Sequence, residues 1–166
     1  MITFQKIRWK NFLSTGDHWS EIDFLGHTTN LVVGTNGSGK STMLDALTFS
    51  LFNKPFRKIN KSQLINATNE KDCVVEVEFT VNNKDYLVRR SIKPNKFDIE
   101  VNGTLLHKES DDRLNQKILE ESILKVNYKS FTQIVILGSS SFVPFMQLST
   151  SNRRDVIEDL LDIRIF

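Results

Sequence analysis

The sequence predicts an α/β fold, with a mixed sheet that contains an antiparallel meander and with a flanking helical segment. Three observations predict it. A glycine-rich segment, Gly34–Thr42, lies between an apolar strand pattern and an apolar helix pattern. The middle of the chain alternates apolar and polar residues between turn-forming pairs, and its last third has apolar residues at helical spacing. With 166 residues, the chain is long enough to bury a core of its own.

The N-terminal third predicts three strands and one helix. The strands are expected at Ile2–Trp9, Ile22–Phe24 and Thr29–Val33, and the last of these leads into the glycines. The helix is expected at Ser41–Phe52 and is apolar around much of its girth. A helix of that kind is buried on most sides.

The middle of the chain predicts the meander. Its strands are expected at Cys73–Val81, Tyr86–Ile92, Phe97–Val101 and Thr104–Leu106. The pairs Asn82-Asn83 and Asn102-Gly103 stand between strands, and such pairs favour tight hairpin turns. The first of these strands alternates Val75, Val77, Phe79 and Val81 with Glu76, Glu78 and Thr80, so one of its faces should meet water.

The last third predicts a helix at Asp111–Leu124, a strand at Phe131–Leu137 and a second helix that starts at an N-cap, Ser151. This second helix reaches the last residue without a stop signal.

Composition excludes several classes of protein. Lys plus Arg number 22 and Asp plus Glu 20, so bulk charge does not indicate nucleic acid or an anionic membrane as a partner. Cys73 is the single cysteine, which excludes an intrachain disulfide and fits a reducing compartment. Apolar runs are too short for a membrane span. We expect a soluble, cytoplasmic protein with no membrane partner.

The strongest signal is Gly34–Thr42, which matches the phosphate-binding pattern G-x-x-x-x-G-K-[ST] between a strand and a helix. Glycines let backbone N–H groups point inward at the positive end of the helix dipole, which forms a nest for phosphates. Lys40 is placed to reach the β and γ phosphates and is the candidate catalytic residue, and the Ser41 hydroxyl is placed to ligate Mg²⁺. The predicted nucleotide-binding residues are Asn36, Gly37, Ser38, Gly39, Lys40, Ser41 and Thr42.

This loop alone does not choose among enzyme classes. The guanine-reading N-K-x-D pattern is missing, which argues against a GTPase. A small nucleotide kinase would need arginines around its phosphates, and Arg89-Arg90 or Arg153-Arg154 could serve. A hydrolase needs an apolar strand that ends in an acidic residue, but Ile134–Leu137 ends at Gly138. We therefore expect this chain alone to hydrolyse ATP negligibly.

Several short motifs together resemble one family. Trp9–Ser14 resembles the K-N-F-x-S opening of the structural-maintenance and recombination-repair ATPases, and Asn36–Leu47 is similar to their phosphate loop and first helix. Lys54–Arg57, Gln63–Asn66 and Phe131–Gly138 more narrowly resemble the SbcC-type ATPase subunits of tailed-phage recombination endonucleases. The resemblance extends over essentially the whole chain.

The resemblance implies that residues 1–150 form the N-terminal lobe of an ABC-type P-loop NTPase head that uses ATP and Mg²⁺. In that family a coiled coil follows, which would begin at residues 151–166, and a C-terminal lobe completes the ATPase site. Two heads dimerise around ATP and control a nuclease subunit on double-stranded DNA. The resemblance also implies a metal-contacting glutamine near residues 138–142, where this chain has none, and Ser139 is the expected occupant of that position.

Two alternatives to this ATPase remain open: a nucleotide-gated DNA tether with little turnover, and the small nucleotide kinase. Four basic residues follow the first helix within eight positions, and they could contact the DNA backbone, contact the nucleotide, or form a solvated loop. These candidate DNA-binding residues are Lys54, Arg57, Lys58 and Lys61. If the protein is phage-encoded, its expected location is the host cytoplasm.

Overall fold

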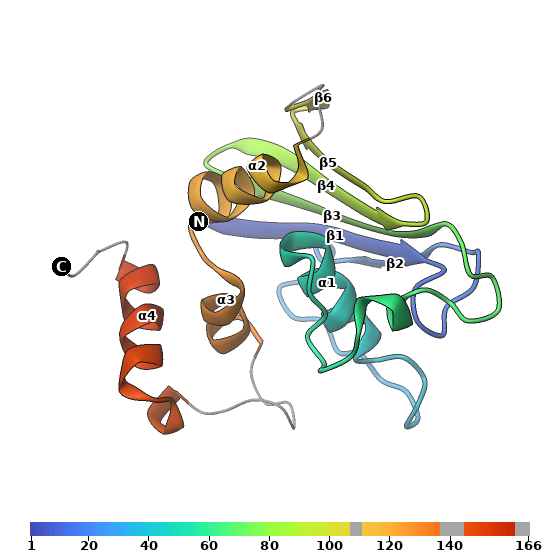
Figure 1. The fold of residues 1–166 in the computed structure, drawn as a ribbon, viewed down its shortest axis with the longest axis horizontal. Coiled ribbons are helices and arrows are strands. Elements are labelled where there is room, and N and C mark those ends of the chain that lie inside the picture. Colours follow the sequence, from blue (N-terminus) through green and yellow to red (C-terminus); the bar gives the residue numbers. More distant parts are fainter. Residues whose placement is uncertain (107–110, 137–144, 162–166) are drawn as a thin grey trace. The chain divides into compact units, whose positions relative to one another are not determined.

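The structure, a computed structural model, describes residues 1–106, 111–136 and 145–161. The chain forms two compact units, Met1–Asn115 and Gln116–Phe166 (Figure 1). Among the described residues, no helix is both long and apolar enough to cross a membrane.

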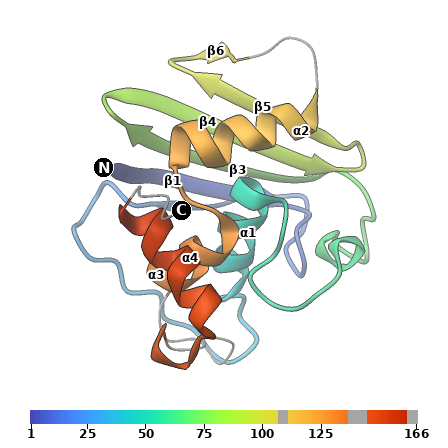
Figure 2. The same ribbon diagram turned by 60° about the vertical axis from the view of Figure 1, so that its left-hand side comes forward.

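Six described strands in the first unit form one antiparallel sheet in the order β2-β1-β3-β4-β5-β6 (Figure 2). The strands are β1 (Ile2–Lys10), β2 (Ser20–Asp23), β3 (Cys73–Val81), β4 (Lys84–Ile92), β5 (Lys96–Val101) and β6 (Thr104–Leu105). Asn82 and Asn83 have φ of 49° and 61°, and Asn102 and Gly103 have 49° and 78°. Positive φ at both central residues is the geometry of a type I′ hairpin turn, so the predicted meander is confirmed.

The core of the first unit lies between the sheet and α1 (Thr42–Phe52), which packs against β1, β3 and β4. Register aligns Ile7, Val77, Val88 and Ile99 in one buried row across four strands. In the C-terminal turn of α1, the Ser50 carbonyl accepts a hydrogen bond from Arg90 Nε at 3.1 Å. This bond satisfies one of the carbonyls that the last turn of a helix leaves unpaired.

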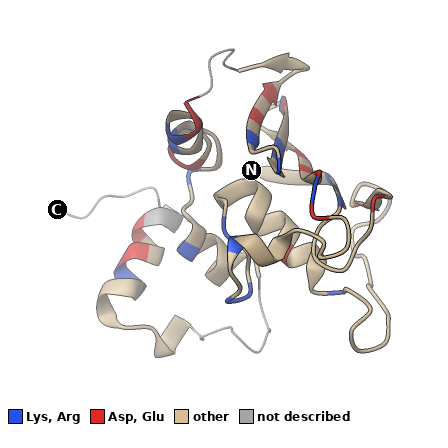
Figure 3. Ribbon diagram, turned by 45° about the vertical axis from the view of Figure 1, so that its right-hand side comes forward, with Lys and Arg blue, Asp and Glu red and all other residues tan. Residues whose placement is uncertain are grey.

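The opposite face of the sheet is charged, and Figure 3 shows both basic and acidic residues on the strands. On this face the register places Glu76 of β3 between Arg8 of β1 and Arg89 of β4. Glu76, only 3% exposed, accepts from the Nε atoms of Arg8 and Arg89 on the two neighbouring strands. The hydrogen bond to Glu76 raises the pKa of Arg89 above its ordinary value. Arg89 is thus held by the sheet and Arg90 by α1. This pair therefore does not supply the phosphate-contacting arginines that a nucleotide kinase would need.

The described residues also form two short 3-10 helical segments, η1 (Lys61–Leu64) in the first unit and η3 (Phe145–Gln147) in the second. Helix α2 (Asp112–Lys117) continues into a π-helical segment, η2 (Ile118–Leu124), which confirms the predicted helix. In the second unit, α3 (Tyr128–Ile134) packs against α4 (Thr150–Leu161). There the Lys129 ammonium contacts Asp155 Oδ2 at 2.9 Å.

Two predicted strands and one predicted cap are wrong. Residues 29–33 are irregular, because no described strand pairs with them, and the Leu31 and Val33 side chains are 88% and 81% exposed. The predicted strand Phe131–Leu137 is helical through Ile134, because the Asn127 side chain accepts the Ser130 N–H at 3.0 Å and starts α3. Helix α4 begins at Thr150, and Ser149 rather than Ser151 accepts the Asn152 N–H, at 3.4 Å.

Candidate functional site

The predicted phosphate loop forms the turn that enters α1. Gly37 and Gly39 have φ of 85° and 90°, a region that disfavours residues with a Cβ. The Ser38 N–H donates to the Thr35 carbonyl at 3.2 Å, which closes the turn. The Ser41 side chain makes no cap hydrogen bond at the start of α1. Its hydroxyl is therefore available to another ligand.

Lys40 bends back over this loop. Its Nζ donates to the carbonyl oxygens of Gly34 and Thr35, at 2.6 and 2.8 Å. Gly34 leaves room for the Ser38 side chain, because a Cβ there would lie 2.4 Å from Ser38 Oγ. The ammonium is thus held beside the loop by neutral acceptors. A phosphate, which carries full negative charge, would compete well for it.

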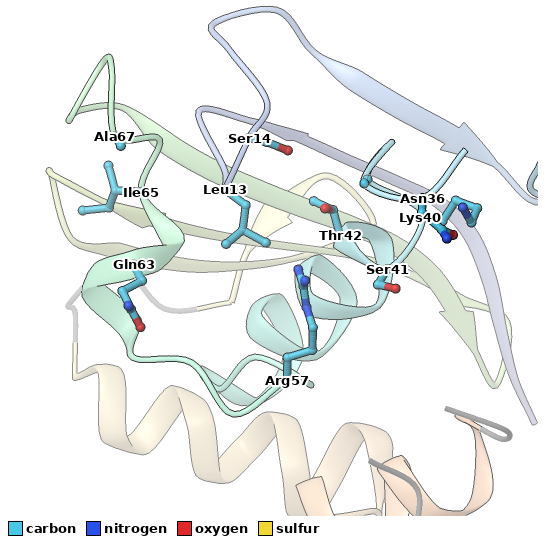
Figure 4. A pocket seen from close by; sticks show the side chains of 12 residues that line it. Leu13, Ser14, Asn36, Lys40, Ser41, Thr42, Arg57, Gln63, Ile65 and Ala67 are labelled. Carbon is cyan, nitrogen blue, oxygen red and sulfur yellow. The ribbon is translucent and has the colours of Figure 1, made fainter. Parts of the chain in front are cut away.

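A cavity of about 600 Å³ opens beside the loop, a size typical of ligand pockets. Its lining residues are Leu13, Ser14, Asn36, Gly37, Gly39, Lys40, Ser41, Thr42, Arg57, Gln63, Ile65 and Ala67. Figure 4 shows Asn36 and Lys40 at one end, Gln63, Ile65 and Ala67 at the other, and Leu13 between them. The pocket therefore has a cationic end at the glycine loop and a more apolar end.

Arg57 enters the pocket from the segment that follows α1, and Figure 4 shows its side chain directed toward Leu13 and Thr42. The Asp45 carboxylate, fully buried in α1, accepts from the Arg57 backbone N–H at 2.9 Å and from Arg57 Nε at 2.6 Å. A buried carboxylate that accepts from one arginine at several points fixes its position. The Arg57 guanidinium is thereby anchored beside the loop.

The structure brings together most of the predicted nucleotide-binding residues. Asn36, Gly37, Gly39, Lys40, Ser41 and Thr42 line the cavity, whereas Ser38 packs beside Gly34 and is not in the lining. Ser139, the predicted second metal contact, lies outside the described residues. No cluster of three His, Cys, Asp or Glu side chains suited to a metal ion occurs in the part of the chain that is described.

The four basic residues after α1 divide into two environments. Arg57 pairs with Asp45 and lines the cavity, while Lys54, Lys58 and Lys61 are exposed and do not line it. Lys61 Nζ lies 5.8 Å from the centre of the Phe49 ring. Burial, and next the charge of Arg90, lower the pKa of Lys61.

Sequence reasoning from the glycine loop did not find the other wall of the pocket. Leu13 and Ser14 follow β1, and Gln63, Ile65 and Ala67 belong to η1 and the loop after it. The signal for them was present in the motifs that carry the resemblance, Trp9–Ser14 and Gln63–Asn66, but those motifs have no chemistry of their own. Their role depends on being folded against the loop.

Comparison with known proteins adds to this geometry. The family model described as "AAA domain" matches residues 6–165. The chain belongs to this AAA domain family. Among the relatives of this AAA domain, Exonuclease subunit 2 of Enterobacteria phage T4 and that of Escherichia phage RB69 are each 44% identical over 95% of the chain. A DNA double-strand break repair Rad50 ATPase of Methanococcus maripaludis is 32% identical over 96% of it.

The chain spans only 28% of the length of the two phage relatives and 16% of the Rad50 relative. A solved structure from work titled "Structural biochemistry of ATP-driven dimerization and DNA stimulated activation of SMC ATPases" has a TM-score of 0.61. It is 22% identical and matches 95% of this chain and 99% of that one. The AAA domain described here therefore has the fold of an SMC-type ATPase head, which confirms the predicted fold class and the resemblance.

Proposed function

We propose that this chain is the ATP-binding N-terminal lobe of an ATPase that acts in DNA recombination or repair. The observation that carries the proposal is the pocket in which Lys40, the glycine loop and the start of α1 meet. The family match and the names of the relatives support it, since those names include an exonuclease subunit and Rad50 repair ATPases.

In this proposal the triphosphate lies against Asn36–Thr42. Lys40 exchanges its two carbonyl acceptors for β and γ phosphate oxygens, and backbone N–H groups at the start of α1 hold the rest. The Ser41 hydroxyl, which caps nothing, fits a role as a Mg²⁺ ligand. Mg²⁺ would supply neutralising charge at the phosphates. Ser139 stays a proposal for a second contact with the metal.

The other end of the pocket fits the nucleoside. Leu13, Ile65 and Ala67 offer apolar surface to a ring, and the cavity connects them with the glycine loop. Arg57, anchored by Asp45 between the two ends, is placed to contact the nucleotide. This arrangement favours the nucleotide role for Arg57 over the DNA role.

The pocket supplies binding groups but no acid–base group. Among its described lining residues there is no carboxylate and no histidine that could orient an attacking water. Leu31, Val32 and Val33, which enter the loop, are 88%, 44% and 81% exposed. We propose that a C-terminal lobe covers this apolar segment and brings the missing carboxylate, and that two such heads dimerise around ATP.

The remaining partners are a nuclease subunit and double-stranded DNA. Lys54, Lys58 and Lys61 are exposed beside the pocket segment, and clustered cations of this kind suit contact with a phosphate backbone. ATP binding and hydrolysis would then control the access of DNA to the nuclease. The lack of a carboxylate in the described lining equally suits the alternative function, a DNA tether with little turnover.

Reconstituted hydrolysis tests the proposal. We expect this chain with MgATP to show negligible turnover, and addition of the C-terminal lobe to produce turnover that Lys40→Met abolishes. The tether alternative predicts that turnover stays near background after addition. Rapid turnover by this chain alone, abolished by Lys40→Met, would show that the chain has a complete site and would contradict the proposal.

A further inference from the structure

A network of asparagine side chains lies directly behind the apolar end of the pocket. It joins the loop after β1, which contributes Leu13, to the loop after η1, which contributes Ile65 and Ala67. Asn11 is 1% exposed and Asn66 is 9% exposed. Buried amides must find partners within the protein, so these two constrain both loops.

The contacts between the loops converge on Leu13. The Leu13 N–H donates to the Leu64 carbonyl at 2.6 Å, and the Leu13 carbonyl accepts from Asn66 Nδ2 at 3.1 Å. The Asn66 N–H donates to the Asn11 carbonyl at 2.9 Å, and this bond lies next to the antiparallel bridge between Phe12 and Ile65. Both polar groups of the Leu13 backbone are therefore held, one by the last residue of η1 and the other by the loop that follows it.

The backbone of Leu13 is strained. Its φ is 54°, in the left-handed region that a leucine rarely occupies. Such a conformation costs about 1–3 kcal/mol and persists only where the surroundings impose it. Here the two bonds to Leu64 and Asn66 impose it, and the Leu13 side chain lines the pocket as a result.

A second layer holds Asn66 itself. Asn66 Oδ1 accepts the N–H groups of Thr68 and Asn69, both at 3.0 Å, and Asn69 Nδ2 donates to Asn11 Oδ1 at 2.6 Å. The amide of Asn66 therefore has two separable functions. Its oxygen shapes its own loop, while its nitrogen reaches across to Leu13.

We propose that Asn66 is a positioning residue that acts through Leu13: its Nδ2 donor holds Leu13 against the nucleoside and so sets ATP affinity without acting on the phosphate loop. The inference rests on the proposed function, since it presumes that ATP occupies this pocket. It adds a determinant of affinity that lies behind the lining.

Asn66→Asp isolates this bond. The aspartate keeps an oxygen for Thr68 and Asn69 but replaces the donor to the Leu13 carbonyl with a second acceptor. Asn102→Asp is the matched control, because Asn102 likewise uses its Oδ1 as an acceptor, for the Asp85 N–H at 2.9 Å, in a hairpin turn that does not line the pocket. Circular dichroism checks that each variant is folded.

The readout is the Kd for MgATP compared with the Kd for magnesium tripolyphosphate, which has the phosphates but no nucleoside. We expect Asn66→Asp to weaken MgATP binding by about tenfold, the size expected when one leucine no longer packs on the ligand. The Kd for magnesium tripolyphosphate should stay within about twofold of the wild-type value. Asn102→Asp should change neither Kd. Equal losses for both ligands, or no loss of ATP affinity, would overturn the inference.

A double-mutant cycle with Leu13→Ala tests whether Asn66 acts through Leu13. Leu13→Ala by itself should weaken the binding of MgATP but not that of tripolyphosphate. Adding Asn66→Asp to Leu13→Ala should then cause little further loss of ATP affinity. Fully additive losses would overturn the inference. If Asn66→Asp does not fold, Leu13→Ala alone decides, and unchanged ATP affinity in it overturns the inference. Failure of the wild-type chain to bind either ligand would instead contradict the proposed function.

Discussion

Gly37 and Gly103 provide a pair of substitutions with the same backbone cost in two different places. Gly37 in the phosphate loop has φ of 85°, and Gly103 in the β5–β6 turn has φ of 78°. A Cβ at either position would meet no atom within 4 Å. Alanine therefore adds no clash at either site, and its cost comes from the backbone alone.

That cost can be estimated. An L-residue in the left-handed region costs about 1–2 kcal/mol. For a chain of this size each 1 kcal/mol lowers Tm by about 2–4 °C, so we expect both Gly37→Ala and Gly103→Ala to lower Tm by about 2–8 °C. Thermal unfolding monitored by circular dichroism measures the two shifts.

The two variants should differ in ATP binding. Relaxation of the strained alanine in Gly37→Ala turns backbone N–H groups away from the phosphates, and each hydrogen bond to a charged group contributes about 1.5–3 kcal/mol. Loss of one such bond should weaken MgATP binding roughly tenfold to a hundredfold. Gly103→Ala should bind as the wild type does. Equal Kd values for the two variants would refute the assignment of this loop to phosphate binding.

Three further predictions concern the surroundings of the loop. Arg57→Ala leaves the buried Asp45 carboxylate without its guanidinium. It should lower the free energy of unfolding, measured by urea denaturation, by about 1–3 kcal/mol and weaken ATP binding, whereas Lys58→Ala should do neither. An unchanged urea midpoint would contradict the anchoring role of this ion pair. Burial raises the pKa of Cys73 to about 12 from 9.0, so the thiol ionises more readily in the unfolded chain and the free energy of unfolding should fall as pH rises from about 9 toward 12. The thiol of the folded protein should also resist alkylation until the chain unfolds. Rapid alkylation of the folded protein would contradict the burial of Cys73. Replacing Lys54 and Lys58 together by alanine should lower the salt slope of DNA binding by about two and leave ATP affinity intact; the opposite pattern would assign the loop to the nucleotide.

The glycine loop, α1 and the meander could be predicted because their signals are local. The motif specifies backbone freedom at Gly37 and Gly39, and the observed φ values of 85° and 90° use it. The alternation of apolar and polar residues from Val75 to Val81 and the two turn pairs indicate the strand faces within a few residues. Nothing distant in the chain is needed for these features.

The two wrong strands show where local reasoning fails. Residues 29–33 and 131–137 are both short apolar runs, which a strand and a buried helix share. A strand also needs a partner, and no described strand pairs with either run. The Asn127 cap, four residues before Phe131, was the local signal for a helix at the second run.

The apolar half of the pocket could not be predicted from spacing. Leu13 and Asn66 are 53 residues apart in sequence, and their contact depends on how the loops after β1 and η1 fold together. The positive φ of Leu13 could not be predicted either, because a leucine in the sequence does not indicate a left-handed backbone conformation. The resemblance pointed to both segments, but the structure was needed to show that they form one wall.

The most direct test of ATP binding at this loop is calorimetric titration of the chain with MgATP, in the wild type, in Lys40→Met and in Lys58→Met. Methionine keeps the length of lysine but removes its charge, and Lys58 is an exposed lysine outside the pocket lining. We predict that Lys40→Met weakens binding by roughly tenfold or more, as expected for loss of a charge-assisted contact, and that Lys58→Met binds as the wild type does. Equal affinity in all three proteins would contradict the central claim that Lys40 and its loop bind the phosphates of ATP.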